Sequence, residues 1–295
     1  MIPARIVTAP QPLLAFLFEG WPVVKRTRVR QWLKFGAVRV NDAVIMRHDH
    51  HLKAGDKVCI QPGKAPPPPA KELPEGVSIL HEDDQLLVIH KPAGLLTIAT
   101  ESEKERTAYS CMMTYLRDAA HSGRARVWIV HRLDRETSGV LLFAKTAEAK
   151  EALQKAWGGF EKTYLAVVEG APAASSGTLR HHVDESQPHR VFIRQGAGPG
   201  AREAITHYRV LRQGLGRSLL ELRLETGRRH QIRIQLAEIG CPVVGDARYG
   251  AKSNPARRLA LHAASLRIRH PEDERILCFE SPLPLELARL LPSQV

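Results

Sequence analysis

Short apolar runs recur along the chain after residue 80, and most have the length of a β-strand. They predict strands at residues 86–89, 127–130, 140–144, 164–168, 204–211 and 219–224. Apolar residues three and four positions apart, as on one face of a helix, are clearest at residues 147–156 and 230–239. Strands dominate and do not alternate regularly with helices. The pattern therefore predicts an α+β fold on a mixed, largely antiparallel sheet.

The N-terminal part of the chain shows a different pattern. Val29, Trp32 and Leu33 recur at helical spacing, and Gly36 is a suitable residue to end that helix. The segments that follow predict a hairpin at residues 38–45, a turn at residues 55–56 and a strand at residues 57–60. Together these elements predict a small module at residues 11–62.

A proline-rich segment at residues 63–75 follows this module and contains four consecutive prolines. Consecutive prolines favour extended polyproline geometry, so the segment is predicted to be a semi-rigid spacer. It separates the small module from a larger domain at residues 76–295.

Composition narrows the classes of partner. The 295 residues, 43% of them hydrophobic, suffice for one large core and a small one. The net charge of +12 favours a polyanion as partner, because neutralising phosphates releases counterions. Residues 11–62 contribute +5 of this charge, with nine Lys or Arg and four acidic residues. Many basic proteins bind no RNA, so charge alone does not decide the function.

Cysteine usage and the absence of long apolar runs indicate the compartment. The four cysteines are far apart and form no CxxC pair, which argues against a zinc ribbon or a disulfide framework. The apolar run at residues 12–18 is too short for a signal peptide. No run approaches the ~20 apolar residues of a membrane helix. We expect a cytoplasmic protein without a membrane partner.

The most informative stretch is residues 131–139, which read HRLDRETSG between two predicted strands. It places Asp134 on a short bend, flanked by Arg132 and Arg135. Nearby cations keep a carboxylate ionised, which suits a nucleophile or an electrostatic stabiliser. A structural turn whose aspartate pairs with an arginine explains the local pattern equally well.

This stretch resembles the signature of the RluA-type family of pseudouridine synthases, which modify rRNA and tRNA. Five further segments resemble other blocks of that family, in the same order along the chain. They lie at residues 82–94, 162–170, 226–233, 245–250 and 261–263. Most blocks are weak alone, but the ordered set is specific. Gln235 and Arg229 depart from the family pattern, where histidine and a smaller residue are common, and we expect both to alter RNA contacts.

The resemblance implies an enzyme that isomerises uridine to pseudouridine in an RNA cleft across the sheet. The reaction needs no redox equivalent or energy donor, so no cofactor is expected. Asp134 would attack the sugar or the ring, or stabilise a cationic sugar. By resemblance, Tyr164 stacks on the target base and assists proton removal, and Arg233 pairs with the catalytic aspartate. The alternatives are a core tyrosine and a surface arginine.

Further residues are assigned to RNA binding. An enzyme that acts on a base must take it out of the stack. By resemblance, Arg132 fills the space left by the flipped base and Leu261 packs against its ring. A phosphate contact and a core leucine are the respective alternatives. Arg228 and Arg229 are predicted phosphate contacts, and Lys91 in the first block is also assigned to RNA.

The order of helix, hairpin and Gly-Asp-strand in the N-terminal module resembles a small RNA-binding module first described in a ribosomal small-subunit protein. The match is weakest at residues 13–18, an apolar run without a clear helical period. The resemblance implies RNA binding by residues 11–62. The alternative is a basic domain that packs on the core and contacts no RNA. A module of this type and the high positive charge together favour large-subunit rRNA over tRNA as the substrate. We also expect the protein to be a monomer.

Two other functions fit parts of the sequence. One is a non-catalytic RNA-binding factor for ribosome assembly on the same fold. The other is an RNA-directed glycosidase, which would need a second carboxylate as proton donor. Glu136 is close to Asp134, but we interpret it as a residue at the surface or at the RNA rim.

Two segments imitate ligand sites. Residues 48–51, read HDHH, lie next to one another without the spacing of a metal-ligand set, so we predict a solvated loop and no metal. Residues 196–200, read GAGPG, imitate a phosphate-binding loop. No helix is expected to begin there and Pro199 removes an amide donor, so we predict a hairpin loop.

Overall fold

The computed structural model describes residues 2–22, 24, 26–34, 36–60, 73–100, 103, 105–120, 125–187 and 190–291. The chain divides into two compact units. The small unit comprises residues 1–72 and 117–124, and the large unit comprises residues 73–116 and 125–295. Most of the expected linker at residues 63–75 lies outside the described residues. None of the described helices is both long and apolar enough to cross a membrane.

The small unit is built on a four-stranded antiparallel sheet in the order β1-β6-β3-β4. Its elements are β1 (Ile2–Ile6), β2 (Gln11–Pro12), α1 (Leu13–Gly20), α2 (Arg26–Lys34), β3 (Val38–Val40), β4 (Ala43–Val44), β5 (His51–Leu52) and β6 (Lys57–Ile60). Strand β1 pairs with β6, so the ordered sheet begins before residue 11, where the sequence placed the start of the module.

The predicted hairpin is confirmed as β3 and β4. Asn41 and Asp42 at its tip have φ angles of 49° and 67°, the left-handed conformation that these residues tolerate in tight hairpin turns. The Asn41 side chain donates to the Asp56 carboxylate at 2.8 Å and accepts from the Lys57 amide at 2.9 Å. The turn and the following strand are thereby tied to the hairpin.

Helix α1 occupies the apolar run in which no helical period was apparent. Its buried residues, Leu13, Phe16, Leu17 and Gly20, do follow helical spacing. The sequence hides this period because Leu14 and Phe18, on the flanks of the helix, are also apolar and pack partly against the same core.

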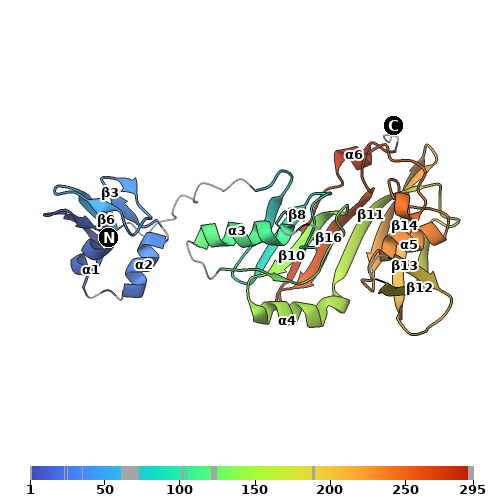
Figure 1. Ribbon diagram of the computed structural model, residues 1–295, viewed down its shortest axis with the longest axis horizontal. Coiled ribbons are helices and arrows are strands. Elements are labelled where there is room, and N and C mark those ends of the chain that lie inside the picture. The colour runs from blue at the N-terminus through green and yellow to red at the C-terminus, as the bar shows by residue number, and fades with distance from the viewer. Residues whose placement is uncertain are drawn as a thin grey trace. The chain divides into compact units, whose positions relative to one another are not determined.

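The large unit is built on one eleven-stranded sheet with the main path β13-β12-β14-β15-β11-β16-β10-β8-β7 (Figure 1). Its strands are β7 (Ser78–Glu82), β8 (Leu86–Lys91), β9 (Trp128–Ile129), β10 (Ser138–Ala144), β11 (Glu161–Glu169), β12 (Ser176–Gln187), β13 (Arg190–Arg194), β14 (Ala201–Gly214), β15 (Arg217–Leu224), β16 (Leu261–Arg269) and β17 (Ile276–Glu280). Strands β10 and β16 run parallel, and the other strand pairs described in this sheet are antiparallel. The prediction of an α+β fold on a mixed, largely antiparallel sheet is confirmed.

Few helices accompany this sheet. They are α3 (Ala108–Ala120), α4 (Ala147–Ala156), α5 (Gln231–Glu238), α6 (Leu285–Ala288) and the 3₁₀ turns η1 (Trp157–Gly159) and η2 (Ala247–Tyr249). The two predicted helices are α4 and α5. Thr146 begins α4 by accepting a hydrogen bond from the Ala149 amide.

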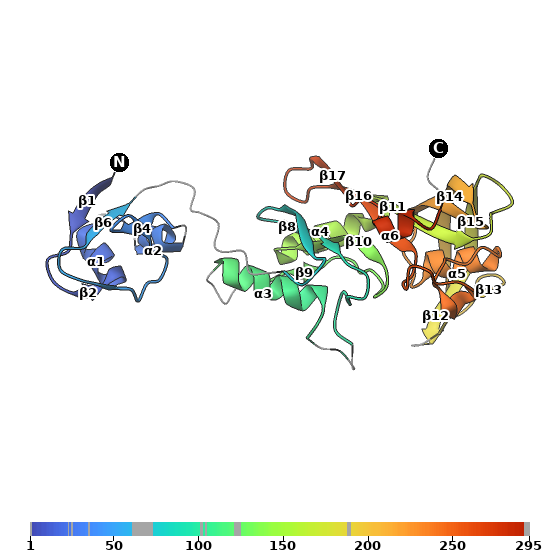
Figure 2. The ribbon, with the colours of Figure 1, turned by 90° about the horizontal axis from the view of Figure 1, so that it is seen from above.

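Strand β10 is buried along its whole length because both of its faces are covered. On one face, Leu142 packs in a cluster with Leu153 of α4. On the other, Phe143 packs in a cluster with Met112 of α3 (Figure 2). This explains why the strand reads as a continuous apolar run instead of an alternating one. The burial of β10 on both faces also holds in place the bend that precedes this strand.

Residues 196–200 do not form the predicted hairpin loop. They connect β13 to β14, and both of these strands pair with β12 instead of with each other. The correction follows from topology, since β12 lies between the two strands that the segment joins.

Candidate active site

Asp134 lies in the bend between β9 and β10, with about a quarter of its side chain exposed. The bend is held by backbone bonds and by one buried threonine. The Thr137 amide donates to the Asp134 carbonyl at 3.2 Å. Thr97 Oγ1 donates to the Leu133 carbonyl at 2.7 Å and accepts from the Leu133 amide at 3.1 Å. The carboxylate is therefore presented from a constrained backbone.

Lys91 stabilises the bend through hydrogen bonds to backbone carbonyls. Its ammonium donates to the carbonyls of Pro92 at 2.9 Å, Leu95 at 2.7 Å and Arg135 at 3.1 Å. The side chain is completely buried, and this burial lowers the pKa of Lys91 to about 7. This contradicts the expected RNA contact, because a fully enclosed ammonium with three carbonyl partners cannot reach a phosphate. The residue holds the loop at residues 92–95 against the bend.

Gly139 allows β10 to approach the neighbouring strand β16. A Cβ atom at this position would lie 2.1 Å from the carbonyl oxygen of Ala263, and the residue has a φ of +120°. Next to it, Ser138 Oγ and His262 Nδ1 lie 2.8 Å apart across the same pair of strands. The last two residues of the HRLDRETSG stretch, Ser138 and Gly139, are therefore explained by the contact between β10 and β16.

Arg233 joins two carboxylates. Its Nη1 lies 3.2 Å from Asp134 Oδ2, which is the pairing that the resemblance implied. Its Nε and Nη2 donate to the two oxygens of Asp246 at 2.7 Å and 2.9 Å. Burial disfavours the guanidinium charge, but the bonds and charges of Asp246 and Asp134 outweigh it and raise the pKa of Arg233. The arginine is therefore a fixed cation beside Asp134.

His230 completes this group. It has a left-handed backbone with φ of 55° and begins α5. Its Nε2 lies 3.9 Å from Asp134 Oδ2, and its Nδ1 lies 2.8 Å from Tyr249 Oη. Burial lowers the pKa of His230 to about 4, against the opposing charge of Asp134. A neutral imidazole therefore stands beside the carboxylate at neutral pH.

The sequence did not single out His230, Asp246 or Tyr249 as site residues. The Arg233 guanidinium lies over the Tyr249 ring, 5.2 Å from its centroid. The available signal was weak: two of the blocks that carried the family resemblance contain these residues, without indicating that they meet at Arg233.

The structure brings six of the predicted residues together around one hollow. They are Arg132, Asp134, Tyr164, Arg228, Arg233 and Leu261. The hollow has both charged and apolar walls. This combination of walls matches the chemistry of a planar ring with polar edges beside an anionic backbone.

Tyr164 and Leu261 belong to the apolar part of the hollow, which also includes Leu133, Leu224 and Ile232. Tyr164 follows an irregularity in the pairing of β11 with β16, where it pairs with Ala263. Leu261 is the first residue of β16 and is almost fully buried. Burial, assisted by the negative charge of Asp134, raises the pKa of Tyr164, so its phenol is neutral at any ordinary pH.

The predicted RNA-binding arginines differ in how they are held. Arg132 is exposed and makes no hydrogen bond or ion pair with any residue that the structure describes. Arg228 Nε donates to the Glu203 carbonyl at 3.0 Å and its side chain reaches the hollow. Arg229 Nη2 donates to the Gln187 carbonyl at 2.7 Å, and the residue does not line the hollow. Of the three, Arg132 is the one whose guanidinium is unengaged at the mouth.

Gln235 is part of the core, which corrects the expectation that it alters RNA contacts. It is fully buried. Its Oε1 accepts from Thr206 at 2.7 Å, and its Nε2 donates to the carbonyls of Leu179 at 3.1 Å and Ala204 at 2.9 Å. The side chain thereby fastens α5 to β12 and β14, beneath Arg233.

Glu136 lines an adjoining hollow together with Asp134, but not the hollow that contains Tyr164 and Leu261. This position agrees with its interpretation as a rim residue. Among the described residues, no group of three or more His, Cys, Asp or Glu side chains could hold a metal ion.

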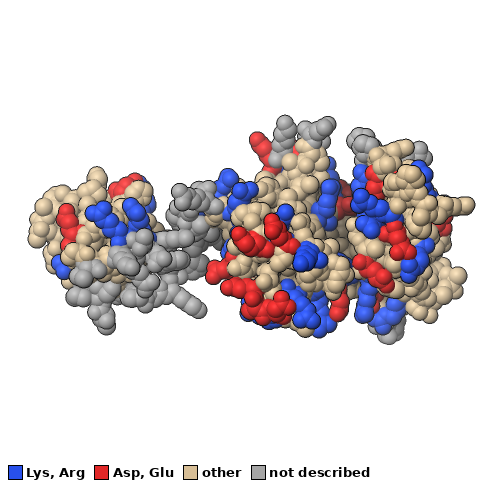
Figure 3. Space-filling model, turned by 90° about the horizontal axis from the view of Figure 1, so that it is seen from below, with Lys and Arg blue, Asp and Glu red and all other residues tan. Residues whose placement is uncertain are grey.

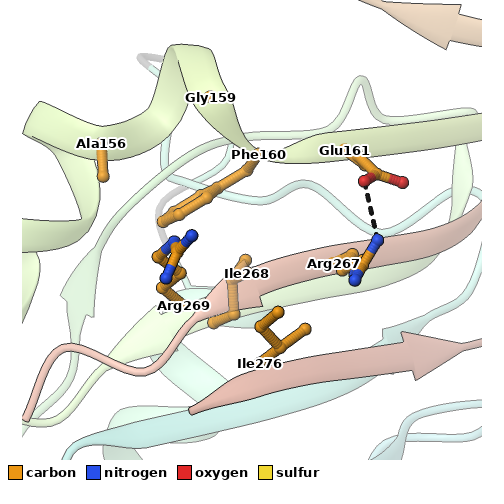
Figure 4. A pocket seen from close by; sticks show the side chains of 8 residues that line it. All are labelled: Ala156, Gly159, Phe160, Glu161, Arg267, Ile268, Arg269 and Ile276. Carbon is orange, nitrogen blue, oxygen red and sulfur yellow. Dashed lines mark hydrogen bonds and ion pairs between the residues drawn. The ribbon is translucent and has the colours of Figure 1, made fainter. Parts of the chain in front are cut away.

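A separate hollow of about 270 Å³ lies between the end of α4, the start of β11 and strands β16 and β17 (Figure 4). It shares no lining residue with the two hollows at Asp134. Arg267 at its edge is paired with Glu161 at 2.9 Å, and Ile276 is half exposed on its wall. It contains none of the residues predicted to carry chemistry.

Comparisons of the sequence and of the fold with known proteins all lead to one family. A family model described as RNA pseudouridylate synthase matches residues 85–238. Ribosomal large subunit pseudouridine synthase D of Xanthomonas campestris is 33% identical over 94% of this chain and 87% of its own. YlyB of Bacillus subtilis, named as an uncharacterised RNA pseudouridine synthase, is 34% identical over 90% and 88%. The solved structure of human RNA Pseudouridylate Synthase Domain Containing 4 is 27% identical, with a TM-score of 0.62 over 75% of this chain and 95% of that one.

Proposed function

The chain belongs to the RNA pseudouridylate synthase family, and from this premise we propose that it isomerises uridines of large-subunit ribosomal RNA with Asp134 as the attacking carboxylate. The members of this family are isomerases that act on RNA. The choice of large-subunit rRNA is supported by the name of the Xanthomonas relative. The assignment of Asp134 rests on one observation: its carboxylate is paired with Arg233 in a hollow walled by Tyr164 and Leu261.

The reaction breaks the bond between C1′ of the ribose and N1 of uracil and forms a bond between C1′ and C5. The C5 proton is lost and N1 gains a proton, so the atoms balance without a co-reactant. Asp134 acts in one of two ways, by bonding to the sugar or ring, or by stabilising a cationic sugar. In either case the carboxylate must be ionised, and the fixed charge of Arg233 at 3.2 Å favours this form.

Tyr164 and Leu261 hold the base while it turns. The apolar leucine and the phenol ring present surfaces suited to a pyrimidine. Because the raised pKa of Tyr164 keeps the phenol protonated, its contribution is contact and hydrogen bonding more than proton removal. Proton abstraction from C5 then falls to another acceptor, and Asp134 supplies the carboxylate among the residues that line the hollow.

A base reaches this hollow only after leaving the RNA stack. The unengaged guanidinium of Arg132, at the mouth of the hollow, is suited to take the place of the flipped base. Lys and Arg side chains lie along both sides of a furrow in the large unit (Figure 3). We assign phosphate contacts to Arg228, which lines the hollow, and to Arg229, the next residue along the chain.

The N-terminal module at residues 11–62 is proposed to add RNA affinity without taking part in the chemistry. Its net charge of +5 supports this role. The proposed range extends to β1, whose pairing with β6 makes it part of the same sheet. We propose a monomer that requires no cofactor.

Product analysis tests the function directly. The wild-type protein is incubated with large-subunit rRNA transcribed without modifications, and the RNA is digested to nucleosides. We expect pseudouridine at one or a few positions and no free uracil. Free uracil would establish a glycosidase instead. Unchanged RNA, bound with measurable affinity, would favour a non-catalytic assembly factor.

A further inference from the structure

A fourth hollow, of about 450 Å³, lies beside the candidate active site between β13, α5 and η2. Its walls combine aromatic, aliphatic and charged side chains. They include Phe192, Ile193, Ile234, Glu238, Arg248 and Tyr249. This volume suffices for a nucleobase, and the mixture of residues differs from the mainly apolar lining usual for small-molecule sites.

This hollow and the active site share a wall. Arg248 lines both this hollow and the adjoining hollow of Asp134 and Glu136, which meets the hollow of Tyr164 and Leu261 at Asp134. Tyr249 belongs to the hollow, while its hydroxyl contacts His230 at 2.8 Å and its ring lies below the Arg233 guanidinium. A strand of RNA that placed one base beside Asp134 would therefore have its neighbouring nucleotide within reach of this hollow.

The side chains suit a single-stranded nucleotide. Phe192 is partly exposed, and the Arg194 guanidinium lies 5.6 Å from its ring centroid. Unpaired bases are bound by stacking on aromatic rings and guanidinium planes, with hydrogen bonds to their edges. Glu238 is exposed at the hollow and accepts hydrogen bonds only, so it matches the amino group of adenine, guanine or cytosine.

Arg248 supplies the charge that such a nucleotide needs. It is exposed and makes no hydrogen bond or ion pair with the residues that the structure describes. Because it lines both this hollow and the adjoining hollow of Asp134 and Glu136, it is suited to the phosphate that joins adjacent nucleotides. An unpaired cation at this junction distinguishes the hollow from the one in Figure 4, where Arg267 is paired with Glu161.

We propose that this hollow is a subsite for the base of a nucleotide adjacent to the target uridine, with Arg248 on the intervening phosphate. The proposal rests on the proposed function, because it takes the target uridine to lie beside Asp134. It gives the enzyme a means to select sequence context: a neighbour that carries an amino group is preferred over uracil.

A double-mutant cycle tests the subsite. The modified uridine is first mapped in rRNA treated with the wild-type protein. Short single-stranded RNAs around it are then made intact or without the base on one side or the other. Pseudouridine formation is measured with wild type, Phe192→Leu, which keeps apolar volume but removes the stacking face, and Ile276→Ala, a control on the separate hollow of Figure 4.

We expect that removing one of the two neighbouring bases lowers the wild-type kcat/KM by roughly 5- to 100-fold, mainly through KM. Phe192→Leu should lose a comparable factor on intact RNA and little more on the RNA that lacks this base, because both changes remove the same contact. Ile276→Ala should behave as wild type. Glu238→Gln should reduce the preference for an amino-bearing neighbour.

The outcomes separate the two proposals. If Phe192→Leu matches Ile276→Ala on every RNA, or loses as much on the RNA without the base as on intact RNA, the subsite is refuted while the isomerase function stands. If the wild type forms no pseudouridine on rRNA or on the short RNAs, the proposed function fails and the subsite fails with it.

Discussion

The bend that carries Asp134 and the segment that carries Asp246 both present a carboxylate to Arg233, but they hold it differently. Asp246 makes two short bonds to the guanidinium and is only 1% exposed. Asp134 makes one longer bond at 3.2 Å and is 25% exposed. Both carboxylate oxygens of Asp246 accept hydrogen bonds from Arg233. Asp134 uses only Oδ2 for this contact, so its Oδ1 remains available to a substrate.

This difference assigns separate tasks to the two residues. A bidentate arginine–carboxylate pair fixes the plane of the guanidinium as well as its charge. Asp246 therefore sets the orientation of Arg233, and Arg233 in turn supplies a fixed positive charge to Asp134. If the comparison is right, changes at Asp134 should abolish chemistry, whereas changes at Asp246 should weaken it.

The largest effect is expected for Asp134→Asn, which keeps the shape of the side chain and removes its charge. Loss of a group that bonds to or directly stabilises the reacting atoms should lower the turnover rate by about 10⁴-fold or more. RNA binding and the thermal unfolding midpoint should change little. Single-turnover formation of pseudouridine measures the loss, with Asp84→Asn, an exposed aspartate elsewhere, as control. Near-normal turnover by Asp134→Asn would rule out its assignment.

Arg233 should tolerate lysine better than leucine. Lysine keeps the charge but cannot bond to Asp246 through two parallel donors, and leucine loses both charge and geometry. We expect a greater loss of kcat for Arg233→Leu. The acid limb of its pH–rate profile should move to higher pH, because the fixed positive charge in the site is then lost. Equal losses and unshifted limbs in both variants would indicate that Arg233 acts only in folding.

Asp246→Asn tests whether Asp246 acts by orienting Arg233. It should lower kcat roughly 10- to 100-fold, since an orientation worth about 1–3 kcal/mol is lost while the Arg233 charge remains. The acid limb of the pH–rate profile should stay where it is in the wild type, in contrast to Arg233→Leu. A loss as large as that of Asp134→Asn would mean that Asp246 acts in the chemistry and not through Arg233.

The sequence predicted the position of the bend before β10 better than it predicted which distant residues contact Asp134. Strand β10 could be located because both of its faces are buried, which leaves a continuous apolar run. That run located the bend that carries Asp134, and the catalytic role of Asp134 was reached through the family resemblance. Its pairing with Arg233, 99 residues away, was reached through family resemblance, because no local pattern encodes a contact across a sheet. Asp246 was missed for the same reason.

Lys91 shows the opposite error. It was assigned to RNA as a residue of the first family block, and a lysine is normally exposed. The structure buries it because the carbonyls of Pro92, Leu95 and Arg135 converge there and need donors. That requirement arises from the turn of the backbone and is invisible in the composition of the motif.

Lys91→Met asks whether the bend needs this support. Three carbonyls would lose their donor, so the free energy of unfolding should fall by about 1–3 kcal/mol, with a modest loss of turnover. The pKa of Lys91 is lowered from 10.5 to about 7, so between these values the unfolded chain binds a proton that the folded chain has released. Wild-type stability should therefore rise with pH in this window, by up to about 1.4 kcal/mol per pH unit, relative to Lys91→Met. Urea unfolding below and above pH 7 measures the difference, and exposed Lys155→Met is the control.

The smallest effect on chemistry is expected from removing residues 1–62, which leaves both carboxylates and Arg233 in place. The segment from 11 to 62 has a net charge of +5, so its loss should weaken binding to long RNA. Each phosphate contact that is lost reduces the slope of log K against log salt concentration by about 0.7–0.9, so the salt dependence should become flatter. Turnover at saturating RNA should fall by much less than in any variant of Asp134, Arg233 or Asp246. Binding titrations at several salt concentrations, beside single-turnover rates, separate the two effects. An unchanged slope would show that the module makes no phosphate contacts, and a collapse of saturated turnover would show that the chemistry depends on more than the large unit.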